Sequence, residues 1–520
     1  MIDAPIVITF VVLGLAVIAF VSGRIPVGLV ALGVALALYL TGVVSFEQAI
    51  AGFGDPVVVY IAALFVVSEA LDATGVTAWA GQQVTRRAGS TLPSVLLWMM
   101  LLVAVVTALI SVNGAVAALI PVGVVLAMRI GRPPSQLLMP LAFAAHAGSM
   151  LALTGTPVNV LVNELALEQG ARAFGFFEFA LVGLPLLTGT VIIVLLLGPR
   201  VLPERVAEHA ARDLSHHAET LALQYSLTPE QARLDRTGGL TEVVVPPRSP
   251  FIGDTVFPGM CTESEELVIV AIQRGGQDVG RTTLRVGDLL LLRGTWEALD
   301  RRAADPGLVV VDAPPTVRRQ AVALGPRSIT SMIVLAGMVV LLATGIVPAA
   351  IAALLAAGAM VLLRVLTVRQ AHRSIAITTL LLVAGMIPLS TAIQTSGAAD
   401  LIAGAITGAL GGAGPLPLLL GIVLVVAILG QFISNMATVL IVAPIAMSIA
   451  EATGLSPLPL LMGIAVAGAA SFLTPVATPA NTMILGPGAY RFGDYWKLGL
   501  PILAFFVAVA VLLVPLIWPF

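Results

Sequence analysis

Polar residues interrupt the apolar sequence at four places, and their types suit the binding of ions. The interruptions read SVNGA at 111–115, TGTPVN at 154–159, SNMAT at 434–438 and TPVATPAN at 474–481. Serine, threonine and asparagine supply neutral oxygen ligands that suit sodium, and carbonyls freed by a break in a helix do the same. Helix N-termini carry partial positive charge and bind anions. The four interruptions therefore predict a site that binds a cation and an anion together.

The interruptions form two pairs that repeat along the chain. Four residue pairs are separated by the same 322 positions: Asn113 and Asn435, Thr156 and Thr478, Pro157 and Pro479, and Asn159 and Asn481. Nearer the C-terminus the distance falls to 316, where EFALVGLP at 178–185 matches DYWKLGLP at 494–501. Two homologous halves explain this shared register better than coincidence does.

Each Thr-Pro pair predicts that a membrane helix stops and restarts. A threonine hydroxyl caps free N–H groups at a helix start, and proline is tolerated at the first helical position. We therefore expect helices to begin at Pro157 and Pro479. Ser111 and Ser434 stand at the tips of two apolar hairpins, so the second arm of each hairpin begins inside the protein.

The composition places these motifs in an all-α polytopic membrane protein. The chain has 520 residues, of which 58% are hydrophobic and 10% charged. Several apolar runs approach the roughly 20 residues that cross a bilayer. Residues 5–22 are expected to be a retained span, because no basic residue precedes them. A single cysteine, Cys261, and the lack of clustered histidines or carboxylates in the sequence argue against an enzyme.

The apolar runs predict five spans and one re-entrant hairpin in each half. The spans of the first half lie near residues 5–23, 26–42, 57–75, 136–161 and 178–197. Residues 94–128 form two apolar arms with arginines on both flanks, so both ends lie on one side of the membrane and the protein receives the tip. The second hairpin covers 415–450. Because five spans is an odd number, the second half is inverted, as in many secondary transporters.

The distribution of basic residues orients this layout. Placing residues 198–322 in the cytoplasm leaves Arg172 as the one basic residue in the external loops of the membrane part. This agrees with the positive-inside rule and puts both termini outside the plasma (inner) membrane. The predicted domains are a first transmembrane repeat at 1–197, a cytoplasmic segment at 198–322 and a second transmembrane repeat at 323–520.

The polar segment between the halves reads as a small α+β domain. Short strands alternate with turns in GLTEVVV, ELVIVAIQRGG and RTTLRVGDLLLLRGT, followed by the helix WEALDRRAA and the strand GLVVVDA. Over about residues 238–312 this pattern resembles a TrkA C-terminal (RCK-C) domain. The resemblance implies that the domain senses a small cytosolic ligand or dimerises.

Further motifs extend along the membrane part. Pro121 and Pro444 follow the hairpin tips, the breaks read GTPVN and ATPAN, and a late segment reads GAYRFGDYWKLGLP. With these motifs the membrane part resembles the divalent anion/sodium symporter family of the ion transporter superfamily. The resemblance implies a homodimer that couples sodium to a small divalent anion, sulfate or a dicarboxylate such as succinate, through an elevator-type movement.

The same resemblance assigns binding residues. It implies one sodium site of Ser111, Asn113, Gly155 and Asn159 and another of Ser434, Asn435, Ala477 and Asn481. It implies substrate contacts from Ser111, Asn113, Thr156, Pro157, Ser434, Asn435, Thr478 and Pro479. Two positions depart from the family pattern, since Val112 stands where the hairpin asparagine is expected and Met436 where a threonine is expected.

A sodium requirement also follows from charge. No Lys or Arg lies within an assigned membrane core, so a dianion needs bound cations and helix N-termini to offset a desolvation cost on the order of tens of kcal/mol. Three alternatives stay open: a proton-coupled carrier, an exchanger of anions or arsenite, and a ligand-regulated channel. The channel is disfavoured because the sequence has no TVGYG-like filter. We expect no organic cofactor and no nucleic-acid partner.

Four other polar residues near the membrane core have simple structural explanations. His146 is expected to hold a backbone carbonyl rather than to titrate. Glu69 and Asp72 are expected at the cytoplasmic end of the third span, and Gln431 is expected to brace the second hairpin tip.

Overall fold

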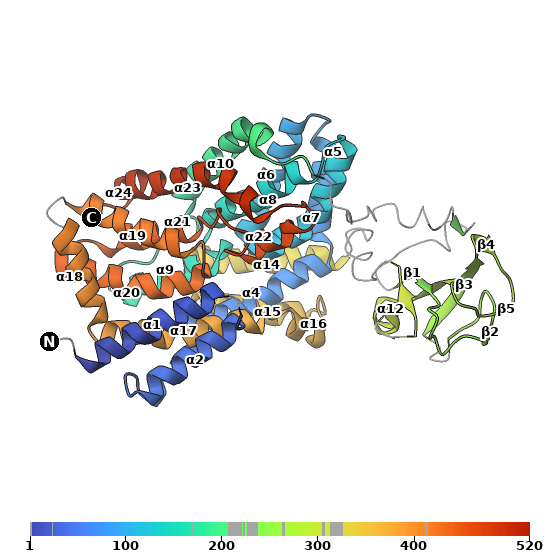
Figure 1. Ribbon diagram of the computed structural model, residues 1–520, viewed down its shortest axis with the longest axis horizontal. Helices are drawn as coiled ribbons and strands as arrows, with labels where there is room; N and C mark the ends of the chain where they lie inside the picture. The colour runs from blue at the N-terminus through green and yellow to red at the C-terminus, as the bar shows by residue number, and fades with distance from the viewer. Residues whose placement is uncertain are drawn as a thin grey trace. The chain divides into compact units, whose positions relative to one another are not determined.

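The chain folds into a helical unit and a smaller unit that contains a β-sheet (Figure 1). The computed structural model describes residues 3–22, 24–168, 170–205, 221, 224–225, 238–262, 266–303, 307–311, 326–410 and 414–520. The helical unit comprises residues 1–71, 80–210 and 330–520, and the smaller unit comprises residues 72–79 and 211–329.

The helices follow the same order in the two halves of the chain. The first half contains α1 (Ala4–Ser22), α2 (Val27–Leu40), α3 (Phe46–Ala51), α4 (Pro56–Ala73), α5 (Val76–Arg87), α6 (Leu92–Leu109), α7 (Val112–Arg129), α8 (Ser135–Gly148), α9 (Pro157–Glu168) and α10 (Ala180–Val201). The second half contains α14 (Pro326–Thr344), α15 (Ala349–Leu362), α16 (Val368–Ser374), α17 (Ile377–Thr395), α18 (Ala398–Leu410), α19 (Pro415–Leu429), α20 (Asn435–Thr453), α21 (Pro457–Gly468), α22 (Pro479–Leu485), α23 (Tyr495–Ala508) and α24 (Val514–Ile517).

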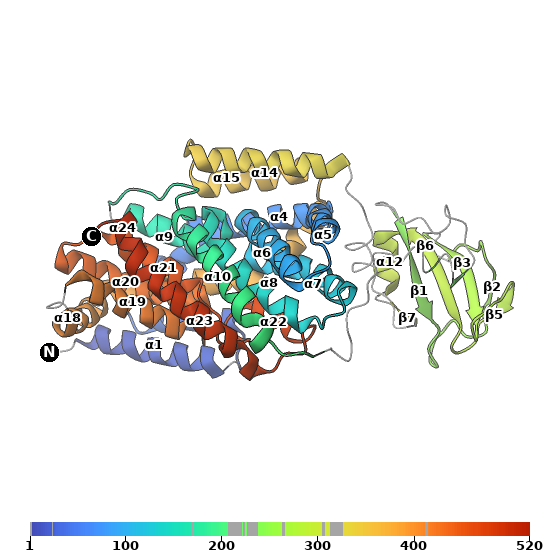
Figure 2. The same cartoon turned by 90° about the horizontal axis from the view of Figure 1, so that it is seen from above.

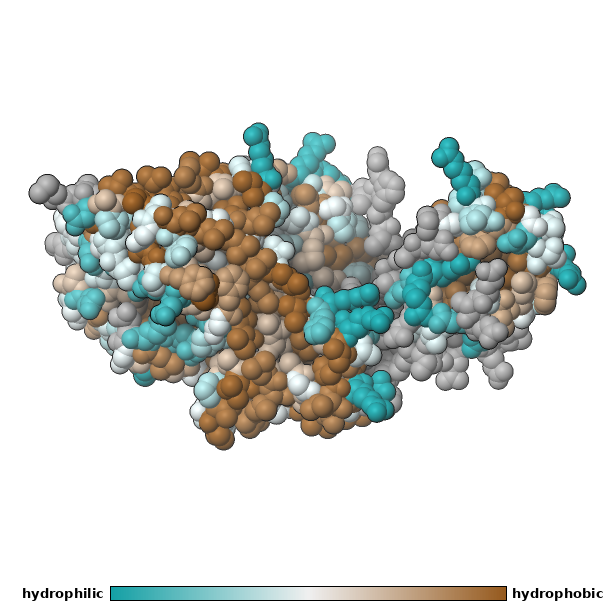
Figure 3. Space-filling view, turned by 90° about the horizontal axis from the view of Figure 1, so that it is seen from below, coloured by the Kyte–Doolittle hydropathy of each residue, from teal (hydrophilic) through white to brown (hydrophobic). Residues whose placement is uncertain are grey.

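The predicted all-α polytopic membrane architecture is confirmed. Within the described residues, nine helices are long and apolar enough to cross a bilayer, and five shorter apolar helices accompany them. Large hydrophobic side chains such as Leu15, Ile18, Leu36 and Leu196 are exposed on the outside of the helices. Apolar residues cover much of the face of the helical unit that Figure 3 shows. Such a surface suits a lipid environment.

Local signals that start helices recur at matched positions in the two halves. Ser45 opens α3 with a capping box to Gln48, and Thr367 opens α16, 322 positions later, with a capping box to Gln370. The hairpins differ by one position, because Ser111 caps α7 and Ser434 caps α20 at a distance of 323. The sequence-based pairing of Asn113 with Asn435 is therefore wrong by one residue. The inverted orientation of the second half stays a prediction.

Two helices are broken where the sequence predicts breaks. In the first half α8 ends at Gly148, two 3₁₀ turns follow at Ser149–Leu151 and Leu153–Gly155, and α9 begins at Pro157. In the second half α21 ends at Gly468 and α22 begins at Pro479. The predicted single span at 136–161 is thus two helices joined by an extended break. Proline restarts the helix in both cases because it lacks an N–H group to satisfy.

The two halves interlock within the helical unit. Helix α9 packs against α20 and α21, and α22 packs against α7 and α8. Helix α2 packs along α17, with α1 beside both. Figures 1 and 2 show the red and orange second half threaded among the cyan and green helices of the first. Residues that are distant in sequence therefore meet at the hairpin tips and helix breaks.

The smaller unit contains the strands that the sequence predicts. Its five-stranded antiparallel sheet has the order β4-β3-β6-β1-β7, built from β1 (Gly238–Val244), β3 (Leu267–Arg274), β4 (Gln277–Asp278), β6 (Leu289–Thr295) and β7 (Val309–Val310). Strands β2 (Thr255–Val256) and β5 (Thr282–Thr283) form a separate pair, and α12 (Trp296–Ala303) follows β6. Most of the predicted linker before residue 238 lies outside the described residues. The RCK-C resemblance stays a prediction.

An ion pair between the partly exposed Arg274 and the buried Asp288 predicts the acid sensitivity of this sheet. Arg274 bonds both carboxylate oxygens of Asp288 at 2.7 Å, and this hydrogen bonding is the main reason that the pKa of Asp288 lies below 3.8. Because the folded pKa is depressed, the stabilisation is fully present above pH 3.8 and is lost as the pH falls through the depressed pKa. We expect Asp288→Asn to speed hydrogen exchange in β3 and β6 of the full-length protein several-fold at neutral pH. Asp254→Asn, which changes an exposed carboxylate, should leave exchange as in the wild type.

Candidate functional site

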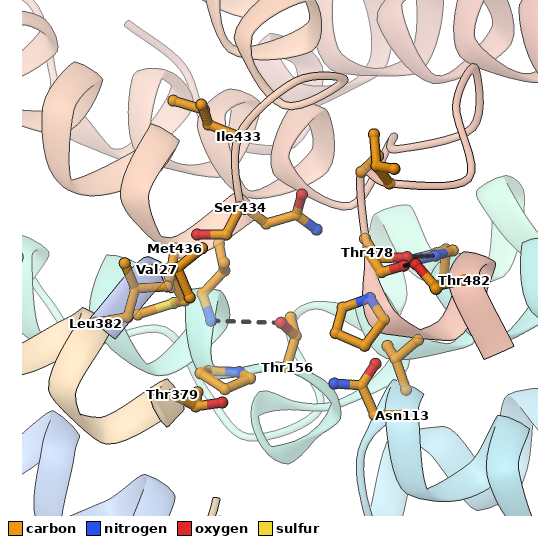
Figure 4. A pocket seen from close by; sticks show the side chains of 18 of the residues that line it. Val27, Asn113, Thr156, Thr379, Leu382, Ile433, Ser434, Met436, Thr478 and Thr482 are labelled. Atoms are coloured by element: carbon orange, nitrogen blue, oxygen red, sulfur yellow. Dashed lines mark hydrogen bonds between the residues drawn. The ribbon is translucent and has the colours of Figure 1, made fainter. Parts of the chain in front are cut away.

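A cavity of about 1020 Å³ lies among the hairpin tips and helix breaks. Its lining includes every residue for which the sequence predicts substrate contact: Ser111, Asn113, Thr156, Pro157, Ser434, Asn435, Thr478 and Pro479. Figure 4 shows Asn113, Thr156, Ser434 and Thr478 around the same space, although they come from four different elements. The structure thus brings these residues together around one cavity.

Helix N-termini point at this cavity from both halves. The Ser111 hydroxyl accepts a hydrogen bond from the Gly114 N–H at 3.2 Å at the start of α7. Ser434 does the same at the start of α20, where its hydroxyl accepts from the Ala437 N–H at 3.2 Å. The Thr478 hydroxyl caps α22 by accepting from the Asn481 N–H at 3.3 Å. The uncapped N–H groups at such helix starts favour a negative charge.

The two predicted asparagines of the breaks lie behind the cavity wall. Asn159 and Asn481 are both fully buried, and neither lines the cavity. The Nδ2 atom of Asn159 donates to the carbonyl oxygens of Ser149 at 2.9 Å and Ala152 at 3.0 Å. We call this group the Asn159 cage. It folds the break around a central asparagine.

The second half repeats this arrangement. The Nδ2 atom of Asn481 donates to the carbonyl oxygens of Ser471 at 2.8 Å and Thr474 at 3.1 Å, and we call this group the Asn481 cage. In both cages the asparagine Oδ1 atom is buried and accepts no hydrogen bond from any described residue. A buried acceptor without a partner costs about 1–3 kcal/mol. The two oxygens lie in matching cages, although the His146 ring stands beside that of Asn481, and each fits a bound cation because sodium binds oxygen ligands.

Two residues that the sequence interpretation missed tie the second hairpin to its break. The Ser471 hydroxyl donates to Asn435 Oδ1 at 2.6 Å, and the Thr474 hydroxyl donates to the Gln431 carbonyl oxygen at 2.8 Å. Gln431 braces the tip as expected, since its Nε2 atom donates to the Ala470 carbonyl at 3.0 Å. Ser149 and Ser471 stand 322 positions apart, so the repeat register could have revealed Ser471, whereas the counterpart of Thr474 is Ala152 and gives no such signal.

The remaining predicted sodium ligands are backbone positions at the cavity edge. Gly155 and Ala477 both line the cavity and are buried. A Cβ atom at Gly155 would overlap the Ser149 carbonyl, so only glycine fits between the break and the cavity. Glu69 and Asp72 do not line the cavity, and Asp72 Oδ1 accepts a hydrogen bond from the Thr77 hydroxyl at 2.8 Å.

His146 has a different partner from the one expected. Its Nε2 atom lies 3.2 Å from the Thr478 hydroxyl, not beside a backbone carbonyl, so the sequence-based expectation is wrong. The ring packs edge-on against Phe472 at 5.8 Å between centroids and stands beside the Asn481 side chain. His146 thereby joins the first-half break to the helix cap of the second half. It is also the one ionisable side chain among the described residues that line the cavity.

We expect His146→Phe to weaken substrate binding while the protein stays folded. Phenylalanine keeps the packing on Phe472 but removes the hydrogen bond to Thr478, which is worth about 1 kcal/mol. The KM for the transported anion should rise several-fold with little change in maximal rate. His146→Gln, which keeps a side-chain donor, should restore most of the affinity. Kinetics of uptake into proteoliposomes measure both, and an unchanged KM in His146→Phe would contradict the expectation.

Broken helices and hairpins that surround one cavity in a polytopic membrane protein define a membrane transporter and not an enzyme. The chain belongs to the citrate transporter family (CitMHS), whose sequence model matches residues 17–439 and 409–520.

Three known proteins are similar to the chain. It is 30% identical to the uncharacterized transporter YfbS of Escherichia coli, over 98% of each chain. It is 25% identical to the probable sodium/sulfate cotransporter 3 of Chlamydomonas reinhardtii, over 54% of this chain and 33% of that protein. A solved structure, the YdaH transporter of Alcanivorax borkumensis, is 16% identical and covers 91% of this chain and 87% of that one, with a TM-score of 0.49.

Proposed function

We propose that this protein is a secondary active transporter that imports a small divalent anion, sulfate or a dicarboxylate, together with sodium ions. The observation that carries the proposal is the pair of buried, unpartnered Oδ1 atoms of Asn159 and Asn481. Each sits directly behind a Thr-Pro helix start that lines the cavity. A cation at each oxygen would satisfy it and lie next to the anion.

The electrostatics of the cavity support this coupling. Among its described lining residues there is no Lys or Arg, so no fixed full positive charge faces a bound dianion. Helix N-termini supply about half an elementary charge each, and exposed hydroxyl and amide groups supply hydrogen bonds. A dianion held mainly by such partial charges needs bound cations to balance the rest of its negative charge. The probable sodium/sulfate cotransporter among the similar proteins agrees with this chemistry.

The residues at the edge of the cavity support a conformation of the transporter in which the cavity opens to the cytoplasm. The cavity extends to Ser22 at the end of α1 and to Thr378 at the start of α17, and both residues are exposed. Arg24 follows Ser22 closely, and Arg491 precedes the lining residue Phe492. By the positive-inside rule this end of the helices is cytoplasmic. The predicted topology, with external termini in the plasma membrane, agrees with this assignment.

Alternating access would follow from an elevator-type movement. The hairpins and broken helices pack on one another across the two halves, so they would move as one body that carries the cavity. The remaining spans would form the scaffold, and the family resemblance implies a homodimer.

Uptake into proteoliposomes tests the proposal. Purified protein is reconstituted and supplied with radiolabelled sulfate, succinate or citrate, with sodium or choline outside. Accumulation of one anion driven by an inward sodium gradient is the expected result. Equal accumulation with a proton gradient and no sodium would favour the proton-coupled carrier, and counterflow without any cation requirement would favour the exchanger.

We also propose, from the RCK-C resemblance, that a small cytosolic ligand binds the sheet-containing unit and sets the transport rate. Deletion of residues 238–312 should leave sodium-dependent uptake in place and remove its response to cytosolic nucleotides. A deletion variant that still responds to them would overturn this assignment.

A further inference from the structure

The two cages differ in how each is connected to the residue that begins the second arm of its hairpin. In the second half that residue is Asn435, whose Oδ1 atom accepts from the Ser471 hydroxyl at 2.6 Å. The Ser471 carbonyl in turn accepts from the Nδ2 atom of Asn481. The hairpin amide is therefore connected to the Asn481 cage through a single serine.

The first half has no such connection among its described residues. The helix start that matches Asn435 is Val112, because Ser111 and Ser434 cap the two helices in the same way. Ser149, the counterpart of Ser471, instead donates its hydroxyl to the His146 carbonyl at 2.7 Å. The Asn159 cage keeps its unpartnered Oδ1 atom but lacks a hairpin amide.

The missing amide is present one residue later. Asn113 is the second residue of α7, and each step along an α-helix turns the side chain by about 100°. Its side chain is exposed, lines the cavity, and forms no hydrogen bond with another described residue. In Figure 4 the Asn113 carboxamide faces the same space as Thr156. The matching position of the second half, Met436, is apolar and also lines the cavity.

We propose that this shift by one residue has moved the first-half hairpin amide from sodium binding to substrate binding. Asn113 donates a hydrogen bond to the anion, and the Asn481 cage, which keeps its hairpin amide, binds sodium more tightly than the Asn159 cage. The inference rests on the proposed sodium-coupled function. It makes the two halves unequal although both breaks fold around a buried asparagine with the same two kinds of carbonyl contact.

Exchanges between valine and asparagine, which remove or add the carboxamide, separate the two roles. The melting temperature of the purified full-length protein is followed as sodium replaces choline at constant ionic strength, which measures sodium binding without transport. Asn435→Val should raise the sodium concentration that gives half of the maximal rise in melting temperature by at least tenfold. Val112→Asn should lower this concentration or make the sodium titration steeper. Asn113→Val should leave the sodium titration unchanged and raise the KM for the transported anion about fivefold or more.

The outcomes distinguish this inference from the function on which it rests. If sodium does not stabilise the wild type relative to choline, and none of sulfate, succinate and citrate is taken up with sodium, both are overturned. If sodium stabilises the wild type but Val112→Asn and Asn435→Val titrate within twofold of it, only the inference fails. It fails equally if Asn113→Val shifts the sodium titration as far as Asn435→Val does.

Discussion

Asn481→Ala is expected to remove most of the sodium-dependent stabilisation, leaving only the part due to the Asn159 cage, and to reduce uptake at least tenfold. The side chain has two functions, because Nδ2 holds the carbonyl oxygens of Ser471 and Thr474 while Oδ1 is left for a cation. Loss of the two hydrogen bonds should cost about 1–3 kcal/mol in total. Loss of the cation also removes the stabilisation that sodium binding gives the folded protein, which reaches about 2.7 kcal/mol when sodium is at 100 times its Kd.

Melting temperatures in sodium and in choline separate these two contributions. The difference between variant and wild type in choline measures the hydrogen bonds, and the additional difference in sodium measures the cation. Thr407→Ala is the matched control, because the Thr407 hydroxyl bonds only the Ala403 and Gly404 carbonyls of its own helix. If sodium stabilises the Asn481→Ala protein as much as it stabilises the wild type, Asn481 Oδ1 is not a sodium ligand.

Features governed by neighbouring residues could be predicted from the sequence. Thr-Pro starts a helix for local reasons, so the starts of α9 and α22 at Pro157 and Pro479 were found correctly. The hairpin tips at Ser111 and Ser434 follow from serine capping and flanking charge in the same way. The sequence therefore predicts the identity of these cavity residues, although not their arrangement.

Features governed by tertiary contacts could not be predicted from the sequence. His146 and Thr478 are 332 positions apart and meet because the two breaks face each other, which no local pattern encodes. The Tyr490 hydroxyl bonds the Ser135 carbonyl in another contact between the halves. Arg205 likewise pairs with Asp494 at 2.6 Å, which ties the beginning of the segment between the halves to the region after α22.

The repeat register and the family pattern disagree at one point, because the family pattern already places Val112 where the hairpin asparagine is expected. Asn113 and Asn435 are identical residues at the common distance of 322, yet the caps show that Val112 is the structural counterpart of Asn435. The second half contains one more residue before its hairpin, since α5 and α18 begin 322 positions apart whereas α6 and α19 begin 323 apart. A shared helix cap indicates which residues are structurally equivalent more reliably than identical residues at a fixed spacing do, because the cap is defined by hydrogen-bond geometry.

Gly499→Ala is expected to distort the second break and to reduce sodium-dependent transport. Gly499 lies on α23 where that helix crosses the break, and a Cβ atom there would overlap the Phe472 carbonyl oxygen. Backbone cannot rotate away as a side chain can, so the methyl group must push the break or the helix aside at a cost of about 1–3 kcal/mol. Phe472 follows Ser471 directly, so the displacement reaches the Asn481 cage.

Gly183 offers an independent check on the same contact in the first half. It lies on α10, and a Cβ atom there would overlap the Met150 carbonyl oxygen next to Ser149. Gly183→Ala and Gly499→Ala should each lower the melting temperature by several degrees and reduce sodium-dependent uptake. Gly404→Ala on α18 has no atom within 4 Å of the added methyl group and should change neither quantity. If Gly499→Ala melts and transports like Gly404→Ala, the close approach of α23 to the break does not position the site.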